Sequence, residues 1–391
     1  MTYKRELQNI KIRKEDKLLL LCARTRINNE IKSQIMSLIQ QEIDWNYLLQ
    51  KSYEHRLTPL LYLQLNNVCP DSIPQNIMKT LKTYFQENAH KNLLFMGELS
   101  KILKLFKSDE ITAIPYKGPI LASQVYGNLA LREFDDLDIY VNKKDVHSAK
   151  KILLSEGYET KLSLKDNQEE KYLKSQREYK FINPNNQIHL EIHWNFIGLS
   201  ISGKWDCFEN HMKFLSAKIH NTDILNLKFE DMLLILCLHA SGHLWERLTW
   251  ICDINEYIKS NNNIDWQYLM ETADELGIRR ILNINLLLAI DLLTLKIPDK
   301  IALELKSDES LINLDHKIKQ NLFEGDEHSR GLYNKAIMRL MIRENYNNKI
   351  LDILKLIFTP TNNEWEHYPL PSKLYPLYYF LRSLNLLKNN Y

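Results

Sequence analysis

Glycine is scarce in this chain, and its spacing excludes one common class of nucleotide-binding protein. The 391 residues include only 10 glycines, whereas average usage of about 7% would give nearly thirty. No two glycines stand at the G-x-G spacing that the phosphate-binding turn of a Rossmann domain requires. The sequence therefore predicts that the protein has no Rossmann dinucleotide-binding fold.

Paired cysteines and long apolar runs are missing as well. The five cysteines are odd in number and contain no C-x-x-C pair, which argues against a zinc knuckle or a disulfide framework. The longest apolar runs, such as Leu18–Ala23 and Leu233–Leu238, are far shorter than the roughly 20 residues needed to cross a bilayer. Residues Met1–Lys14 alternate in charge and lack the apolar core of a signal peptide. We therefore expect a cytoplasmic protein that does not enter a membrane.

An excess of charge of one sign is also lacking. The 51 Lys and Arg residues nearly balance the 49 Asp and Glu residues, for a net charge of +2. This balance argues mildly against an extended contact with nucleic acid. Apolar residues make up 45% of the chain and charged residues 26%, which is typical of a soluble globular protein with a sizeable core. At about 150 residues per domain, the length predicts two to three domains.

The hydrophobic pattern changes twice along the chain. Apolar residues recur at helical spacing in the first hundred residues and again after Lys228, which indicates two helical regions. Between them, short apolar and β-branched segments predict strands, at residues 111–118, 136–141, 179–182 and 188–194. Helices are expected over 119–126 and 144–156 in this part and over 233–257 as one segment further on, and the proline- and aromatic-rich tail 364–373 is expected to lie over the surface. The predicted fold class is α+β, with a small mixed β-sheet core (109–227) between helical regions (1–108 and 228–391).

Two aspartates on one predicted strand suggest a metal site. The strand's period of two places Asp136 and Asp138 on one face and the apolar Leu137 on the other. Two carboxylates about 7 Å apart repel each other unless a cation lies between them, and hard divalent cations prefer such oxygen ligands. Glu191 joins the aspartates if its strand pairs beside theirs. The alternative is that both aspartates lie on the surface of an edge strand.

Other polar residues near these acids have two interpretations each. Arg132, four residues before Asp136, can contact the acids or a phosphate, or can form a structural ion pair. His193 shares the Glu191 face of its strand, where it suits either a position beside the metal or a structural hydrogen bond.

Two further motifs resemble known sites only in part. His239 and His243 have a zinc-capable spacing but lack the glutamate of H-E-x-x-H, so a packing role is the default. The stretch 198–204 nearly matches a P-loop, yet Trp205 follows where a hydroxyl is needed, so we expect a turn.

Taken together, these motifs resemble a known family. Lys117-Gly118, a short helix, the Arg-x-x-x-Asp-x-Asp pattern of 132–138 and the Glu-Ile-His-Trp of 191–194 are similar to the uncharacterised nucleotidyltransferases of the polymerase-β-like superfamily. Flanking helical segments extend the resemblance to roughly residues 15 to 300, at 43–49, 55–61 and 236–248 with Asp253. Each piece is weak alone, and the specificity comes from their order.

The resemblance implies a reaction and a set of residues for it. It implies transfer of a nucleoside monophosphate from an NTP to a hydroxyl-bearing acceptor, which can be a small molecule, a peptide, a protein or a tRNA end. Asp136 and Asp138 would bind two Mg²⁺ ions, and Glu191 would bind one of them and help to deprotonate the acceptor. A role in the substrate pocket is also implied for His239, Arg247 or Asp253.

One departure from the superfamily pattern concerns the triphosphate. The usual Gly-Ser before the helix is Gly118-Pro119 here, and Ser123 comes one turn later. Lys117 can supply the missing phosphate contact, so the expected nucleotide-binding residues are Lys117, Gly118, Ser123 and Arg132; the competing role for Lys117 is an ion pair with a nearby carboxylate such as Asp135 or Asp136. The departure also motivates an alternative, a catalytically degenerate nucleotidyltransferase fold that acts as a binding or regulatory module.

Overall fold

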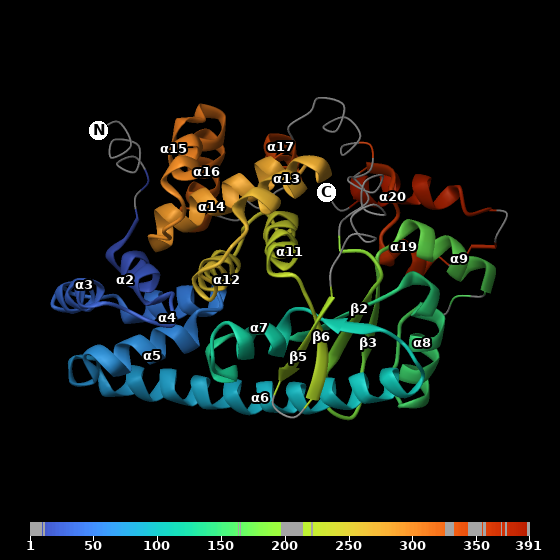
Figure 1. Ribbon diagram of the computed structural model, residues 1–391, viewed down its shortest axis with the longest axis horizontal. Helices are drawn as coiled ribbons and strands as arrows, with labels where there is room; N and C mark the ends of the chain where they lie inside the picture. The colour runs from blue at the N-terminus through green and yellow to red at the C-terminus, as the bar shows by residue number, and fades with distance from the viewer. Residues whose placement is uncertain are drawn as a thin grey trace.

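The protein is mostly helical around one small sheet, as Figure 1 shows. The computed structural model describes residues 10, 12–162, 164, 166–196, 214–219, 222–324, 332–342, 354, 357–368, 370–371 and 374–388. Within them lie a mixed four-stranded sheet, a separate two-stranded sheet and helices on both sides in the sequence. The predicted α+β class is therefore confirmed. The P-loop-like stretch 198–204 lies outside the described residues.

The N-terminal part is a set of helices that ends in one long helix. Their bounds are α2 (Lys14–Cys22), α3 (Asn29–Ile39), α4 (Trp45–Glu54), α5 (Thr58–Val68), a 3₁₀ turn η1 (Pro70–Ser72) and α6 (Gln75–Ser108). Asn28 and Asp44 cap α3 and α4 by accepting hydrogen bonds from backbone amides of their first turns. Helix α6 runs along the lower edge of the molecule in Figure 1, beneath both the helical part and the sheet.

The central part builds the sheet. Its elements are β1 (Ala113–Pro115), α7 (Gly118–Gln124), η2 (Leu129–Leu131), β2 (Asp136–Val141), η3 (Lys143–Asp145), α8 (Val146–Ser155), α9 (Asp166–Ser175), β3 (Glu178–Ile182) and β4 (His189–His193). The strand order is β1-β2-β4-β3. Strand β2 is antiparallel to β1 and parallel to β4, and β3 is antiparallel to β4. The predicted strands are therefore confirmed, whereas α9 was not predicted.

A β-hairpin and the second helical region complete the chain. Their bounds are β5 (Phe214–Ile219), β6 (Thr222–Leu227), α11 (Phe229–Gly242), α12 (Leu248–Lys259), α13 (Trp266–Leu276), α14 (Arg279–Leu293), α15 (Asp299–Ser307), α16 (Glu309–Phe323), α17 (Leu332–Ile342), α19 (Asn362–His367) and α20 (Leu377–Lys388). The expectation of one segment over 233–257 is wrong. Leu244 and Trp245 both adopt positive φ, so the helical backbone breaks there and turns from α11 into α12.

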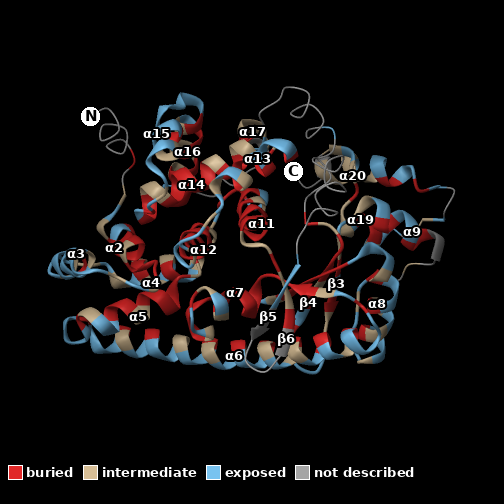
Figure 2. Cartoon of the chain, in the orientation of Figure 1, coloured by how far each residue is buried: buried red, intermediate tan, exposed pale blue. Residues whose placement is uncertain are grey.

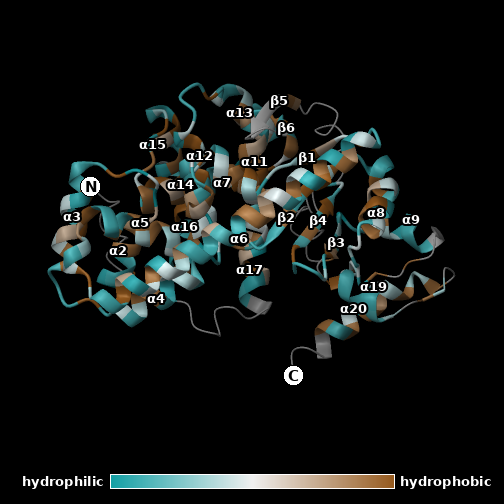
Figure 3. Ribbon diagram, turned by 90° about the horizontal axis from the view of Figure 1, so that it is seen from below, coloured by the Kyte–Doolittle hydropathy of each residue, from teal (hydrophilic) through white to brown (hydrophobic). Residues whose placement is uncertain are grey.

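Two hydrophobic cores hold these elements together. One joins the N-terminal helices to α11–α16 across the molecule, and the other lies between the sheet, α6 and α8. Figure 2 shows the buried residues on the inner faces of the helices, and Figure 3 shows that α6 carries apolar and polar residues on different faces. The prediction that the tail 364–373 lies over the surface is wrong for Trp365, which is buried on α19 and stacks on Tyr378. Among the described residues, no helix combines the length and apolar character needed to cross a membrane.

Candidate metal centre

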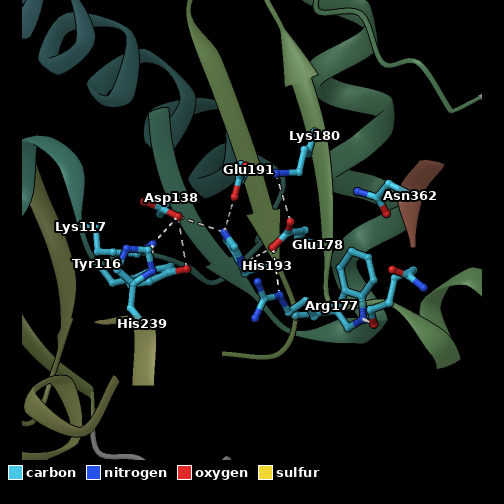
Figure 4. Close-up of polar contacts among 12 residues, drawn as sticks. Tyr116, Lys117, Asp138, Arg177, Glu178, Lys180, Glu191, His193, His239 and Asn362 are labelled. Carbon is cyan, nitrogen blue, oxygen red and sulfur yellow. Dashed lines mark hydrogen bonds and ion pairs between the residues drawn. The ribbon is translucent and has the colours of Figure 1, made fainter. Parts of the chain in front are cut away.

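The strand pairing brings the predicted acids together. Asp138 and Glu191 are direct neighbours in the register of the parallel pair β2 and β4, which confirms the pairing on which the predicted site depends. Asp138, Glu191 and His193 each offer one ligand atom, and these atoms all lie within 4.8 Å of one another. Figure 4 shows the three side chains pointing toward one another from the two strands, with Lys117 on the other side of Asp138.

Asp138 is the best-compensated acid of the site. Its Oδ1 lies 2.9 Å from Lys117 Nζ, 3.0 Å from His193 Nε2 and 3.4 Å from the Tyr116 hydroxyl, which donates a hydrogen bond. Burial by itself raises the pKa of the Asp138 carboxyl. The Lys117 ammonium and the His193 hydrogen bond outweigh burial, and the resulting pKa lies well below its usual range. The carboxylate is therefore held ionised inside the protein.

His193 lies between three carboxylates. Its Nε2 is 3.0 Å from Asp138 Oδ1 and 3.3 Å from Glu191 Oε2, and its Nδ1 is 3.5 Å from Glu178 Oε2. Burial lowers the pKa of the imidazole, but hydrogen bonds to Asp138 and Glu191 outweigh burial and raise the pKa to about 9. Glu178, the first residue of β3 and the register partner of His193, was not singled out from the sequence. Extending the predicted strand 179–182 by one residue toward the N-terminus would have placed Glu178 beside the site.

Glu191 and Asp136 differ in their surroundings. Burial raises the pKa of Glu191, but the His193 hydrogen bond lowers it to below the usual value, and Lys180 adds an ion pair from β3. Asp136 is partly buried and, among the described residues, is not part of the group of converging ligand atoms. Burial and the neighbouring Asp138 carboxylate raise the pKa of Asp136. A role for Asp136 in metal binding stays a prediction.

The turn after β1 positions Lys117 over this site. Lys117 is 9% exposed, and its Nζ lies 3.3 Å from His239 Nδ1 as well as beside Asp138. Gly118 has a φ of +48°, and a Cβ placed there would lie 3.1 Å from the backbone oxygen of Asp136. A side chain at 118 would therefore combine a disfavoured backbone conformation with a tight contact, so glycine is required where α7 approaches β2.

Sequence comparison identifies the family of this chain. A family model described as "Uncharacterised nucleotidyltransferase" matches residues 41–294. The chain belongs to this family. The matched segment contains both predicted metal-binding strands, helices α4–α6 before them and helices α11–α14 after them. No curated protein and no solved structure matches the chain.

Arg132 and Ser123, two further residues predicted for the site, lie in other surroundings. Arg132 donates from Nε and one terminal nitrogen to the two carboxylate oxygens of Asp253 on α12, at 2.8 and 2.9 Å. The Tyr126 hydroxyl donates to the same carboxylate at 2.6 Å. These buried contacts match the structural interpretation of Arg132, since they tie the sheet part to the second helical region. Ser123 lies half-buried on α7, and its nucleotide contact stays a prediction.

His239 near the end of α11 and His243 just after it belong to the surroundings of the candidate metal centre. His239 packs edge-on against His243 and Trp250, and His243 stacks on Trp250 with ring centroids 4.8 Å apart. Burial and the neighbouring Lys117 lower the pKa of His239 to well below the usual value. A neutral His239 can therefore accept a hydrogen bond from the Lys117 ammonium. The Arg247 guanidinium lies 5.8 Å from the Trp250 ring centroid.

Proposed function

We propose that this protein is a metal-dependent nucleotidyltransferase that moves a nucleoside monophosphate from an NTP to a hydroxyl-bearing acceptor. The observation that carries the proposal is the convergence of Asp138, Glu191 and His193 on one sheet face, in a chain that belongs to a nucleotidyltransferase family. In this reaction the acceptor oxygen bonds to the α-phosphorus while the bond to the leaving phosphate breaks, and pyrophosphate is released.

The donor set fits a divalent cation. Asp138 and Glu191 supply carboxylate oxygens that are ionised at neutral pH, because their pKa values are lowered. We expect Asp136, two residues before Asp138 on β2, to complete the site, and the family resemblance implies two Mg²⁺ ions. A bound divalent cation stabilises charge on the transferred phosphoryl group and lowers the pKa of a bound hydroxyl.

Glu191 and Lys117 have the other proposed roles. The Glu191 carboxylate accepts a hydrogen bond from the acceptor hydroxyl and so orients it and draws off its proton as the new bond forms. The Lys117 ammonium neutralises Asp138 in the described arrangement, and it would be available to a phosphate oxygen if a cation shared the Asp138 carboxylate. Lys117 thereby supplies the contact that a serine after Gly118 would make elsewhere in the superfamily.

Binding and turnover can be measured separately. Calorimetric titration with each α,β-methylene NTP analogue, with and without a divalent cation, should show nucleotide binding that depends on the cation. Release of pyrophosphate from the matching NTP, with water as a slow acceptor, then reports chemistry. Asp138→Asn should abolish both the cation dependence and the release of pyrophosphate.

The two function hypotheses predict different results in this experiment. Cation-dependent nucleotide binding with pyrophosphate release supports the enzyme. Saturable nucleotide binding without any release, even at high protein concentration, supports the binding or regulatory module. Absence of nucleotide binding with every cation would refute both.

A further inference from the structure

We propose that His193 Nε2 is itself a metal ligand, and that the centre consequently prefers Mn²⁺ or a similar first-row transition metal over Mg²⁺. This inference rests on the proposed metal centre of the nucleotidyltransferase. It changes the expected donor set from three carboxylates to two carboxylates and one imidazole, and it assigns a role to a histidine that the proposed reaction does not otherwise use.

The spacing of the donor atoms supports ligation by His193. Its Nε2 lies 3.0 Å from Asp138 Oδ1 and 3.3 Å from Glu191 Oε2. Neighbouring ligands of an octahedral cation with bonds of about 2.1–2.2 Å lie about 3.0–3.1 Å apart. His193 Nε2 therefore already has nearly the separation from each carboxylate oxygen that a shared cation requires. Binding of a cation there would release the proton that Nε2 holds between the two acids.

The other ring nitrogen of His193 provides an independent observation. Histidines that bind metals usually donate their second ring N–H to a carboxylate, which fixes the tautomer and the ring orientation. Here Nδ1 faces Glu178 Oε2 at 3.5 Å, while Nε2 faces the two acids of the centre. Glu178 in turn is held by Lys180 at 3.2 Å and by Arg177 at 3.2 Å. We therefore assign Glu178 as a positioning residue for the His193 ligand.

The strand register explains why these four side chains meet. Glu191 and His193 are two residues apart on β4 and share one face. Asp138 is the neighbour of Glu191 on β2, and Glu178 is the neighbour of His193 on β3. The opposite face of the same strands carries the buried Leu190 and Ile192. The centre is thus built on rigid paired strands, which favours a defined ligand geometry.

The donor chemistry determines the metal preference. Mg²⁺ binds oxygen ligands and holds its water shell tightly, whereas imidazole nitrogen suits Mn²⁺, Fe²⁺, Co²⁺ and Zn²⁺ better. A centre with one nitrogen donor should therefore discriminate against Mg²⁺ more strongly than a carboxylate centre does. Replacing the nitrogen donor by an oxygen donor of similar reach should weaken that discrimination.

Binding of the metal alone tests the proposal without reference to turnover. Mn²⁺ affinity of the full chain is measured from the loss of the free Mn²⁺ EPR signal, and Mg²⁺ affinity by competition. In His193→Gln the Mn²⁺-over-Mg²⁺ affinity ratio should fall by about tenfold or more. His90→Gln, an exposed histidine on α6, is the matched control and should keep the ratio of the parent. Circular dichroism confirms that each variant is folded.

A spectroscopic measurement on the unmodified protein avoids reliance on a variant. Electron spin-echo modulation of bound Mn²⁺ should show ¹⁴N coupling from a directly bound imidazole. Glu178→Gln should lower Mn²⁺ affinity by about 10- to 100-fold and retain that coupling. Saturable Mn²⁺ binding without ¹⁴N coupling, or an unchanged affinity ratio in folded His193→Gln, overturns the His193 assignment and leaves the proposed function intact. No saturable binding of either metal refutes the metal centre, and with it the proposed function.

Discussion

Lys117 and Asp138 form a nearly buried ion pair that joins the turn after β1 to the middle of β2, with 2.9 Å between Nζ and Oδ1. His193 approaches the same carboxylate oxygen from β4. Asp138 therefore has two cationic partners at close range, whereas among the described residues no ion pair involves Asp136, two residues earlier. This difference between two acids on one strand face gives the first prediction.

Asp136→Asn and Asp138→Asn should have opposite effects on stability measured in a chelator. Burial and Asp138 raise the pKa of Asp136, so a neutral side chain at 136 should leave the free energy of unfolding equal or higher. Neutralising Asp138 leaves the Lys117 ammonium without its anionic partner, and losing one member of a buried ion pair costs about 3–5 kcal/mol. Urea unfolding of both variants checks this, and equal destabilisation would show that Asp136 is paired as well.

Lys117→Met should weaken NTP binding much more than nucleoside binding, because the lost contact is to phosphate. A charge-assisted contact of this kind is worth roughly 1.5–3 kcal/mol, or about 10- to 150-fold in affinity. Calorimetry with NTP and nucleoside measures the two losses. Lys104→Met, on the exposed face of α6, controls for the loss of one positive charge. An equal loss for nucleoside and triphosphate would mean that Lys117 serves the fold through Asp138 rather than the phosphates.

Arg132→Met should destabilise the protein by about 3–5 kcal/mol, because it leaves the buried Asp253 carboxylate without its cationic partner. The double variant Arg132→Met/Asp253→Leu should recover much of that loss, since it removes both charges. Thermal unfolding of the single and double variants forms the cycle that measures the coupling. If the double variant instead loses the sum of both single effects, the pair carries no coupling. A selective loss of triphosphate affinity in the folded single variant would restore the phosphate role predicted for Arg132.

Stability should fall with rising pH because of a buried cluster far from the metal centre. Lys319 contacts both Asp291 and Asp315, so two carboxylates share one ammonium. Burial and the Asp291 charge raise the pKa of Asp315 to about 7, although Lys319 opposes them. Because the pKa of Asp315 is higher in the folded state, its protonated carboxyl contributes to the stability of the fold. That stability is fully present below about pH 4, the unfolded pKa, and is lost as the pH rises through about 7.

Asp315→Asn keeps the group neutral and should remove this dependence. Relative to the variant, the parent should lose stability between pH 5 and pH 8, by roughly 1–4 kcal/mol at about 1.4 kcal/mol per pKa unit. Urea unfolding at the two pH values measures the difference. A difference between parent and variant that does not change with pH would show that Asp315 stays ionised beside Lys319.

Local pattern was enough to predict the strands of the sheet and the convergence of two acids. The alternation in 136–141 determines which face carries Asp138, and the same rule applies to Glu191 on its strand. The polar segment 166–175 lacks a strong apolar period, so α9 was missed. Its Glu169 is held by Lys150 and by the Tyr179 hydroxyl, which are contacts that follow from packing rather than from the sequence around Glu169.

The sequence by itself determined the family, the fold class and the face of β2 and β4 on which the acids lie, because these depend on residue order and on the period of two along a strand. The tertiary structure alone decided the partners of the charged groups. Arg132 meets Asp253 from 121 residues away, Lys117 meets His239 from 122 residues away, and Glu178 reaches the second nitrogen of His193 across a strand pair. Such partners are set by how helices and strands pack in three dimensions, and no local spacing in the chain encodes them.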